Sequence, residues 1–205
     1  MEGPDRGYAT RPHRGRGAEA TVNGEASDDA SPARRVFIMS ALPTVEQVSE
    51  LPTVTEMSVP EEFLDENHHM NITHYLSLGA RGIGSRCDDM GLGQSYIDDR
   101  RLTIFTAEHH IRYFAELRLG QDLSVHVRFL ERSAKALHAM AFLVNRSTDV
   151  LACTLEVSLV HVGMDTRRPA DFPDDIALRI DEAIKADDSY SWPAPVCGVM
   201  GVRRR

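Results

Sequence analysis

One stretch of sequence decides the fold, and it reads ITHYLSLGARGIGSRC at residues 72–87. Its apolar or small residues lie at positions 72, 75, 76, 79, 80 and 83, which is the spacing of an amphipathic helix. Gly79, Gly82 and Gly84 each cost an isolated helix roughly 1 kcal/mol relative to alanine. These glycines predict that something packs very close to the helix backbone, and a curved sheet wrapped around the helix would meet that requirement.

Strand-like sequence flanks this helix on both sides. The expected strands, rich in β-branched or alternating apolar residues, are 53–59, 102–117, 123–130, 136–144 and 151–162. Short polar connections separate the last four, which is typical of an antiparallel meander. A second amphipathic helix is expected at 174–186. The fold class is therefore α+β, with an antiparallel sheet of about five or six strands wrapped around one long central helix.

Composition limits the classes of function. The chain has 205 residues and a net charge of −8, which argues against a nucleic-acid partner because phosphates require a basic face. No apolar run approaches the ~20 residues of a membrane helix, and the first residues lack the apolar core of a secretory leader. Cys87, Cys153 and Cys197 fit neither a disulfide framework nor a CxxC metal site. We therefore expect a soluble, reduced, cytoplasmic protein that engages neither nucleic acid nor membrane.

Polar side chains gather just before the long helix. Asp65, Asn67, His69 and Asn71 precede a helix start whose free N–H groups and partial positive charge can stabilise an oxyanion. A carboxylate at such a place can attack a carbonyl or activate water, so these are the parts for acyl transfer to water. The structural alternative is an Asx-type turn in which Asn71 caps the helix.

Two motifs carry a family resemblance. The pattern Asp65-x-Asn67-x-His69-Met70-Asn71-x3-Tyr75 resembles hotdog-fold acyl-CoA thioesterases of the 4-hydroxybenzoyl-CoA thioesterase type. The later pattern Glu108-x-His110-Ile111-x-Tyr113 is similar to a branch that includes the betainyl-CoA thioesterases. Further pieces in the same order are Ser133-x-Lys135-x2-His138, His161-Val162 and Pro193-x-Pro195, so that the resemblance covers roughly residues 52–205.

The resemblance implies an activity and an assembly. It implies hydrolysis of an acyl-CoA thioester to a free acid and CoA, with Asp65 as nucleophile or general base and the backbone N–H near Ile72 as oxyanion hole. It implies a homodimer or a dimer of dimers with active sites at the interface, and no metal or redox cofactor. His68 stands where the family has glycine, and a turn with positive φ there suits glycine better than histidine.

The resemblance also divides the chain. Residues 1–38 hold almost nothing to bury and are expected to be a disordered extension. Residues 39–165 would form the hotdog domain, and 166–205 a C-terminal helix with an arm that either packs on a partner subunit or stays loose.

Several other side chains have two interpretations. Asn71 is a catalytic candidate or a cap, and Glu108 is a second catalytic carboxylate facing Asp65 or one half of a strand-face salt bridge. His69, Tyr75 and His110 match family positions and are expected at the substrate, and His69 has the alternative of a hydrogen bond within the loop. His109 points to the opposite strand face from Glu108 and His110. No metal site is expected from His68, His69 and His74, because their spacing completes no ligand set.

The anionic substrate requires a local basic patch. Arg128, Arg132 and Lys135 lie on one expected strand and its turn, where they either meet phosphates or line a solvated turn. Two other functions stay open from the sequence, a non-catalytic acyl-CoA-binding protein and a hotdog enoyl-CoA hydratase.

Overall fold

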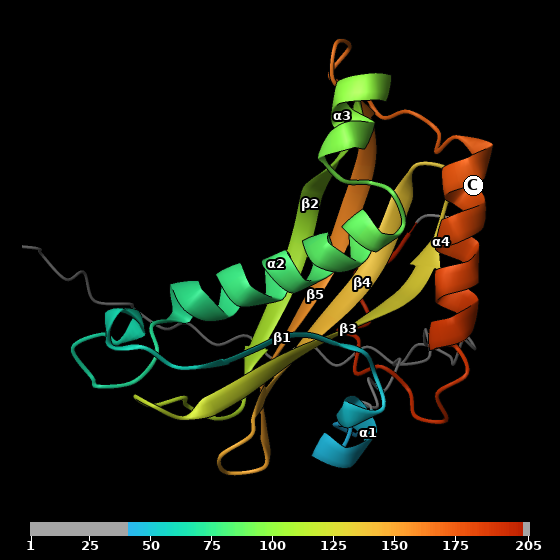
Figure 1. Cartoon of the computed structure of the whole chain (residues 1–205). Coiled ribbons are helices and arrows are strands. Elements are labelled where there is room, and N and C mark those ends of the chain that lie inside the picture. The colour runs from blue at the N-terminus through green and yellow to red at the C-terminus, as the bar shows by residue number, and fades with distance from the viewer. Residues whose placement is uncertain (1–40, 203–205) are drawn as a thin grey trace, which may run out of the picture. The chain divides into compact units, whose positions relative to one another are not determined.

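The structure is a computed structural model, and it describes residues 41–202 (Figure 1). The prediction for residues 1–38 falls outside the described part of the chain. Five antiparallel strands form one sheet, and they are β1 (Thr53–Ser58), β2 (Leu102–Tyr113), β3 (Asp122–Arg132), β4 (Ala136–Asn145) and β5 (Val150–Gly163). The predicted α+β class and antiparallel sheet are therefore confirmed, and the expected strand positions match to within a few residues.

The order of the strands differs from a simple meander. The order is β1-β3-β4-β5-β2, so that β3, β4 and β5 follow one another as predicted, but β2 pairs with β5 and not with β3. The 114–121 segment carries the chain between these separated strands. The prediction that a short polar connection joins β2 to a neighbouring β3 is wrong, because this connection crosses the end of the sheet.

The long helix α2 (Ile72–Asp89) packs along one face of the sheet, here called the α2 face (Figure 1). A Cβ added at Gly79 would lie 2.8 Å from Leu155 of β5, and one at Gly82 would lie 2.8 Å from Val125 of β3. The predicted close packing is therefore confirmed at these two glycines. A Cβ at Gly84 would meet nothing within 4 Å, so the third glycine faces open space.

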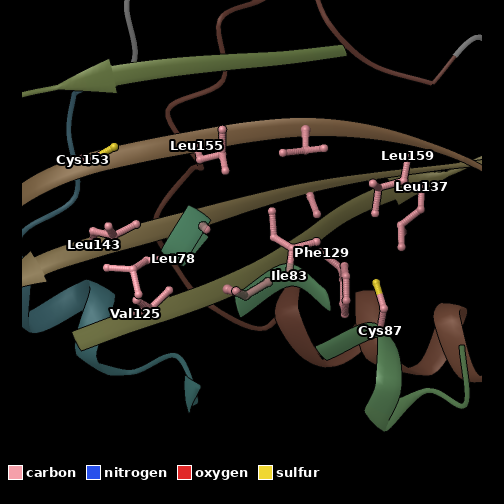
Figure 2. Close-up of a cluster of buried hydrophobic side chains, with 14 of the residues drawn as sticks. Leu78, Ile83, Cys87, Val125, Phe129, Leu137, Leu143, Cys153, Leu155 and Leu159 are labelled. Carbon is pink, nitrogen blue, oxygen red and sulfur yellow. The ribbon is translucent and has the colours of Figure 1, made fainter. Parts of the chain in front are cut away.

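The main core lies between α2 and the sheet. Figure 2 shows Leu78 and Ile83 of the helix beside apolar side chains of the strands, including Phe129 and Leu155. These strand residues alternate with neighbours that point the other way, as the period of two requires. Burial of this apolar layer supplies most of the driving force for the fold, at roughly 25 cal/mol per Å².

The opposite face of the sheet, here called the outer face, has a second and smaller core. Met140, Phe142 and Val144 of β4 lie on it together with Trp192. Trp192 belongs to the C-terminal arm, defined as residues 189–202, and its ring packs edge-on against Phe142 with 5.5 Å between ring centroids. This part of the arm therefore packs on the chain's own sheet.

Within residues 41–202 the fold has three further α-helices and one short 3-10 helix, η1 (Glu61–Phe63). The helix α4 (Asp174–Asp187) was predicted, whereas α1 (Val45–Ser49) and α3 (Gln94–Arg100) were not. Thr44 caps α1 in a reciprocal capping box with Gln47, a pattern that is readable in the sequence. At the end of α4, the buried Asp187 accepts a hydrogen bond from the Phe129 N–H at 2.7 Å, which joins α4 to β3.

Candidate functional site

The loop before α2 is closed by its own backbone. Leu64 and Met70 form an isolated β-bridge, the Asp65 N–H donates to the His69 carbonyl at 3.1 Å, and the His68 N–H donates to the Asp65 carbonyl at 3.0 Å. The Asp65 carboxylate accepts the Asn67 N–H at 2.9 Å. The His69 Nδ1 lies 3.6 Å from the same carboxylate oxygen, and the Asp65 side chain is 12% exposed. The loop therefore fixes one carboxylate oxygen and brings His69 beside Asp65.

His68 occupies the tight turn of this loop with φ of 61°. The expectation that this position requires positive φ is therefore confirmed. Histidine is among the residues that tolerate this region better than most, at a cost of roughly 1–2 kcal/mol. With histidine at this position, the loop is closed by the Asp65–His69 and His68–Asp65 backbone hydrogen bonds.

Asn71 is the N-cap of α2. Its side-chain oxygen accepts the Thr73 N–H at 2.9 Å and the Thr73 hydroxyl at 2.8 Å, and its carbonyl accepts the His74 N–H. The cap leaves the Ile72 N–H without a hydrogen-bond partner among residues 41–202, and the Ile72 residue is 61% exposed. An open donor at the positive end of a helix can hold a developing negative charge.

Tyr75 links α2 to the segment that follows β2. Its hydroxyl accepts the Leu117 N–H at 2.9 Å and lies 3.4 Å from the Ala115 carbonyl, to which it donates. Burial raises the pKa of the Tyr75 phenol to about 12. The Leu117 carbonyl in turn accepts the Met70 N–H at 2.7 Å. Tyr75 is thus a brace under the Asp65 loop, and its contact with substrate stays a prediction.

Glu108 and His110 lie on the outer face. Glu108 is paired with Ser158 and His110 with Glu156, and directly paired residues point to the same side of a sheet. The intervening His109 is paired with Val157, which belongs to the core under α2. The prediction that Glu108 and His110 share a face is confirmed. The prediction that Glu108 faces Asp65 across a pocket is wrong within this chain, because the strand alternation turns Glu108 away from α2.

An open hollow of about 470 Å³ lies beside the Asp65 loop. Its lining comes from Asn67 and His68 of the loop and from Arg118 and Leu119 of the crossing segment, with Leu64. Arg118 is exposed, and its guanidinium donates to Glu116 at 2.7 Å. Arg118 was not among the predicted residues, because the sequence places it 50 positions from the loop that it adjoins.

A smaller apolar pocket of about 200 Å³ lies between α2 and the strands β2 and β5. The helix contributes four residues, Leu76, Ala80, Ile83 and Gly84. The strands contribute Ile104, Thr106, His109, Leu155, Val157 and Leu159. The missing side chain at Gly84 therefore leaves space in a pocket, whereas at Gly79 and Gly82 it allows close packing of α2 on the sheet. His109, which was not predicted at the site, is its only imidazole lining residue.

The three predicted basic residues are each engaged. Arg128 is 6% exposed on the outer face, where its guanidinium donates to the Trp192 carbonyl at 2.7 Å and lies over the Trp192 ring. Arg132 donates to Asp181 of α4 at 2.6 Å, and the Lys135 ammonium lies 3.5 Å from Asp171. Arg128 is therefore not available for phosphates, and the predicted three-residue basic patch is not present on the surface of this chain.

The sequence matches the family model described as the Thioesterase-like superfamily over residues 59–180, which is more than half of the chain. The chain belongs to this superfamily. The matched region runs from the end of β1 through the Asp65 loop, α2 and the sheet into α4.

Individual thioesterases resemble the chain over similar lengths. The betainyl-CoA thioesterase of Pseudomonas aeruginosa is 25% identical, with 76% of this chain and 98% of that protein covered. The L-carnitine dehydrogenase/betainyl-CoA thioesterase of Ruegeria pomeroyi is 29% identical over 75% of this chain, which spans only 31% of that longer protein. A Staphylococcus aureus protein solved in complex with CoA is 25% identical and superimposes with a TM-score of 0.67, covering 75% and 97% of the two chains.

Membership of the thioesterase-like superfamily confirms the resemblance and the thioester-hydrolase class expected from the two motifs. The predicted hotdog fold is confirmed as well, because the chain belongs to the thioesterase-like superfamily and its five-stranded sheet with α2 matches solved structures, the CoA complex among them, along most of their length. None of the helices in the described part of the chain is long and apolar enough to cross a membrane.

Proposed function

We propose that this protein hydrolyses an acyl-CoA thioester to a free acid and CoA. The observation that carries the proposal is a single loop that holds the carboxylate of Asp65 and leads into the start of α2, where the Ile72 N–H is open. Support comes from the superfamily and from relatives that are named thioesterases.

The chemistry uses groups of the protein alone. The Asp65 carboxylate activates a water molecule or attacks the thioester carbonyl itself, and the carbonyl oxygen becomes an oxyanion. The Ile72 N–H donates to that oxyanion, assisted by the positive end of α2. Collapse of the tetrahedral intermediate expels the CoA thiolate, and attack by Asp65 would add a second step in which water releases the acid. The Asn67 N–H orients the Asp65 carboxylate, and the His69 ring nitrogen lies 3.6 Å from it.

The CoA moiety fits the open hollow beside the Asp65 loop better than it fits the predicted patch of Arg128, Arg132 and Lys135. The hollow adjoins the Asp65 loop and holds an exposed guanidinium, that of Arg118, which can pair with a phosphate in place of Glu116. Arg132 forms an ion pair with Asp181, and Lys135 forms one with Asp171. Each could bind a phosphate of CoA only after it separates from its carboxylate partner.

The apolar pocket fits the acyl group. A volume of about 200 Å³ is smaller than the roughly 300–1,000 Å³ of pockets that hold whole ligands, so it suits one part of the substrate. Among residues 41–202, the lining has no carboxylate and no Phe, Tyr or Trp ring, which are the groups that recognise a quaternary ammonium. The acyl group is therefore proposed to be short and aliphatic, in contrast to the trimethylammonium acyl group in the names of the betainyl-CoA thioesterase relatives.

The edge of β2 fits a second copy of the chain. β2 pairs with β5 on one side only, and residues 105–109 along it are exposed. A twelve-residue strand with an open edge is a template for pairing with another strand. The proposed assembly is a homodimer joined at β2, or a dimer of such dimers, and the mass in solution measures it.

The proposed location is the cytoplasm. Cys87, Cys153 and Cys197 are all free thiols in the structure, and the first two are buried. Secreted proteins of this size commonly use cysteines in disulfides, so free thiols are consistent with a reducing compartment.

A substrate panel tests the function. Purified full-length protein is given straight-chain, branched, aromatic and quaternary-ammonium acyl-CoAs, and the released thiol is followed with DTNB while a titration measures acyl-CoA binding. We expect fastest release from a short aliphatic acyl-CoA. Tight binding without thiol release would favour the non-catalytic acyl-CoA-binding alternative, and consumption of an enoyl-CoA without thiol release would favour the hydratase.

A further inference from the structure

A cluster of three chemically different donors lies on the outer face, away from the proposed active site. His110 of β2 and Glu156 of β5 are directly paired residues, and Cys197 of the C-terminal arm lies over them. One ligand atom from each, an imidazole nitrogen, a carboxylate oxygen and the Cys197 sulfur, lie within 4.8 Å of one another. Three segments that are far apart in the sequence therefore converge at one point.

Glu156 is the buried centre of the cluster. The residue is 1% exposed, and its carboxylate accepts the His138 Nε2–H at 2.9 Å and the Cys197 N–H at 2.7 Å. Among residues 41–202, His138 is the one side chain within ion-pair distance of Glu156. A buried carboxylate is costly unless a cation or several hydrogen bonds compensate it, and the two hydrogen bonds to Glu156 leave further lone pairs of its oxygens able to bind a cation.

We propose that His110, Glu156 and Cys197 bind one zinc ion. Thiolate, imidazole and carboxylate are the donors that zinc prefers, and three protein ligands leave a fourth tetrahedral position for water. Zinc–ligand bonds of about 2.0–2.3 Å place the ligand atoms about 3.3–3.6 Å apart. Zinc binding requires the present spacing, within 4.8 Å, to close to that value, and the two ligands other than Glu156, His110 and Cys197, are only half-buried.

Residues next to the cluster are placed to orient the proposed ligand Glu156. His138 donates to the Glu156 carboxylate, and its other ring nitrogen lies 3.5 Å from the Glu131 carboxylate. Hydrogen bonds of this kind orient ligating carboxylates. The Glu131 carboxylate also accepts the Val202 N–H at 3.1 Å, so the arm is held at a second point beyond the cluster.

The zinc ion would hold the C-terminal arm against the sheet. Cys197 comes from the arm, Glu156 from a central strand and His110 from the edge strand, so one ion would join all three. Metal binding that requires the folded arrangement stabilises that arrangement. The inference stands apart from the hydrolase proposal, because the cluster lies on the face opposite to α2.

Zinc competition measures the site directly. The metal-free full-length protein, kept reduced, is titrated with zinc against a chromophoric chelator. We expect one zinc per chain, with affinity reduced by more than about 10-fold in Cys197→Ser and in His110→Ala. His109→Ala is the matched control, because His109 is the adjacent residue of the same strand and points to the α2 face. Its zinc affinity should equal that of the unaltered protein.

Cobalt identifies the sulfur ligand independently. Co²⁺ in place of zinc should give a near-ultraviolet sulfur-to-cobalt charge-transfer band that Cys197→Ser abolishes. Zinc should also raise the melting temperature of the unaltered protein but not that of Cys197→Ser, whose fold is checked by circular dichroism. Absence of stoichiometric zinc binding would overturn the proposal. Equal zinc affinity in the unaltered protein, Cys197→Ser and His110→Ala would also overturn it.

Discussion

The two faces of the sheet are built in opposite ways. The α2 face is almost wholly apolar, and its one sizeable interruption is a pocket beside the helix. The outer face mixes a small apolar core with buried polar side chains, including His126, Arg128, His138 and Glu156. On the outer face, the C-terminal arm supplies partners for Arg128 and Glu156.

The difference suggests that one face of the sheet serves the reaction and the other serves stability. The α2 face gathers the groups proposed for the reaction: the Asp65 loop, the helix start and the acyl pocket. The outer face holds the arm by hydrogen bonds to buried charged groups, which makes it a structural surface. Changes on the outer face should therefore affect stability more than turnover, and changes in the α2 pocket should do the reverse.

Trp192→Ala should give the largest loss of stability. The residue is 4% exposed and packs against Phe142, so truncation leaves a cavity worth about 3–5 kcal/mol in the free energy of unfolding. Denaturant titration measures this loss, and kcat of the folded enzyme should be unchanged. Val199→Ala, in the same arm but 76% exposed, is the control and should stay within about 0.5 kcal/mol of the original protein. Equal stability of the two variants would contradict the role given to the arm.

Gly82→Ala should be destabilising although alanine favours helices. The new Cβ would lie 2.8 Å from Val125 and 3.0 Å from Val54, both of them stiff β-branched side chains. Overpacking of this kind costs about 1–3 kcal/mol, which outweighs the roughly 1 kcal/mol gained in helix propensity. Thermal unfolding measures the balance, and an increase in melting temperature would show that the sheet does not press on α2 at this point.

Gly84→Ala is the opposite case on the same helix. Nothing lies within 4 Å of the new Cβ, so the variant should gain up to about 1 kcal/mol of stability. The added methyl group occupies the proposed acyl pocket, so kcat/KM should fall for the longer acyl-CoAs and stay nearly constant for the shortest. A uniform change across acyl lengths would show that this pocket does not hold the acyl chain.

Acid should weaken both faces by a small amount. Burial lowers the pKa of His126 on the outer face and of His161 on the α2 face. The hydrogen bond from each Nδ1 to a backbone carbonyl raises the pKa, but by less than burial lowers it. The unfolded chain then binds more protons, so stability is lost as the pH falls below about 6.5, by less than about 1.4 kcal/mol per pH unit for each residue. His126→Gln should be less stable at neutral pH but show a shallower pH dependence of its melting temperature; an equally steep dependence would contradict the assignment.

Much of the α2 face could be predicted because its information is local. The helix spacing, the three glycines and the strand alternation each depend on residues a few positions apart, and the motif around Asp65 is a single continuous loop. The positive φ at His68 was expected from the resemblance, because the family has glycine at this position. The capping role of Asn71 was likewise one of two interpretations that the sequence allowed.

The outer face could not be predicted in the same way. His110 lies beside Glu156 because β2 pairs with β5. The two residues are 46 positions apart in the sequence, and Glu156 and Cys197 are 41 apart, so no local sequence pattern indicates these contacts. Arg128 looked like a free cation for the same reason, since Trp192 lies 64 positions away. Glu108 was assigned to the wrong side because the alternation alone does not say which face of a strand meets the helix.

The comparison of Asp65→Asn with Glu108→Gln tests the central claim, that chemistry is confined to the α2 face. Each variant removes one carboxylate charge with little change in shape, one in the loop before α2 and one on the outer face. The measurement is kcat for the best acyl-CoA, with the molar mass checked in solution. The account predicts a loss of about 10²–10⁴-fold for Asp65→Asn and the original kcat for Glu108→Gln. An undiminished kcat in Asp65→Asn, or a comparable loss in Glu108→Gln, would contradict it.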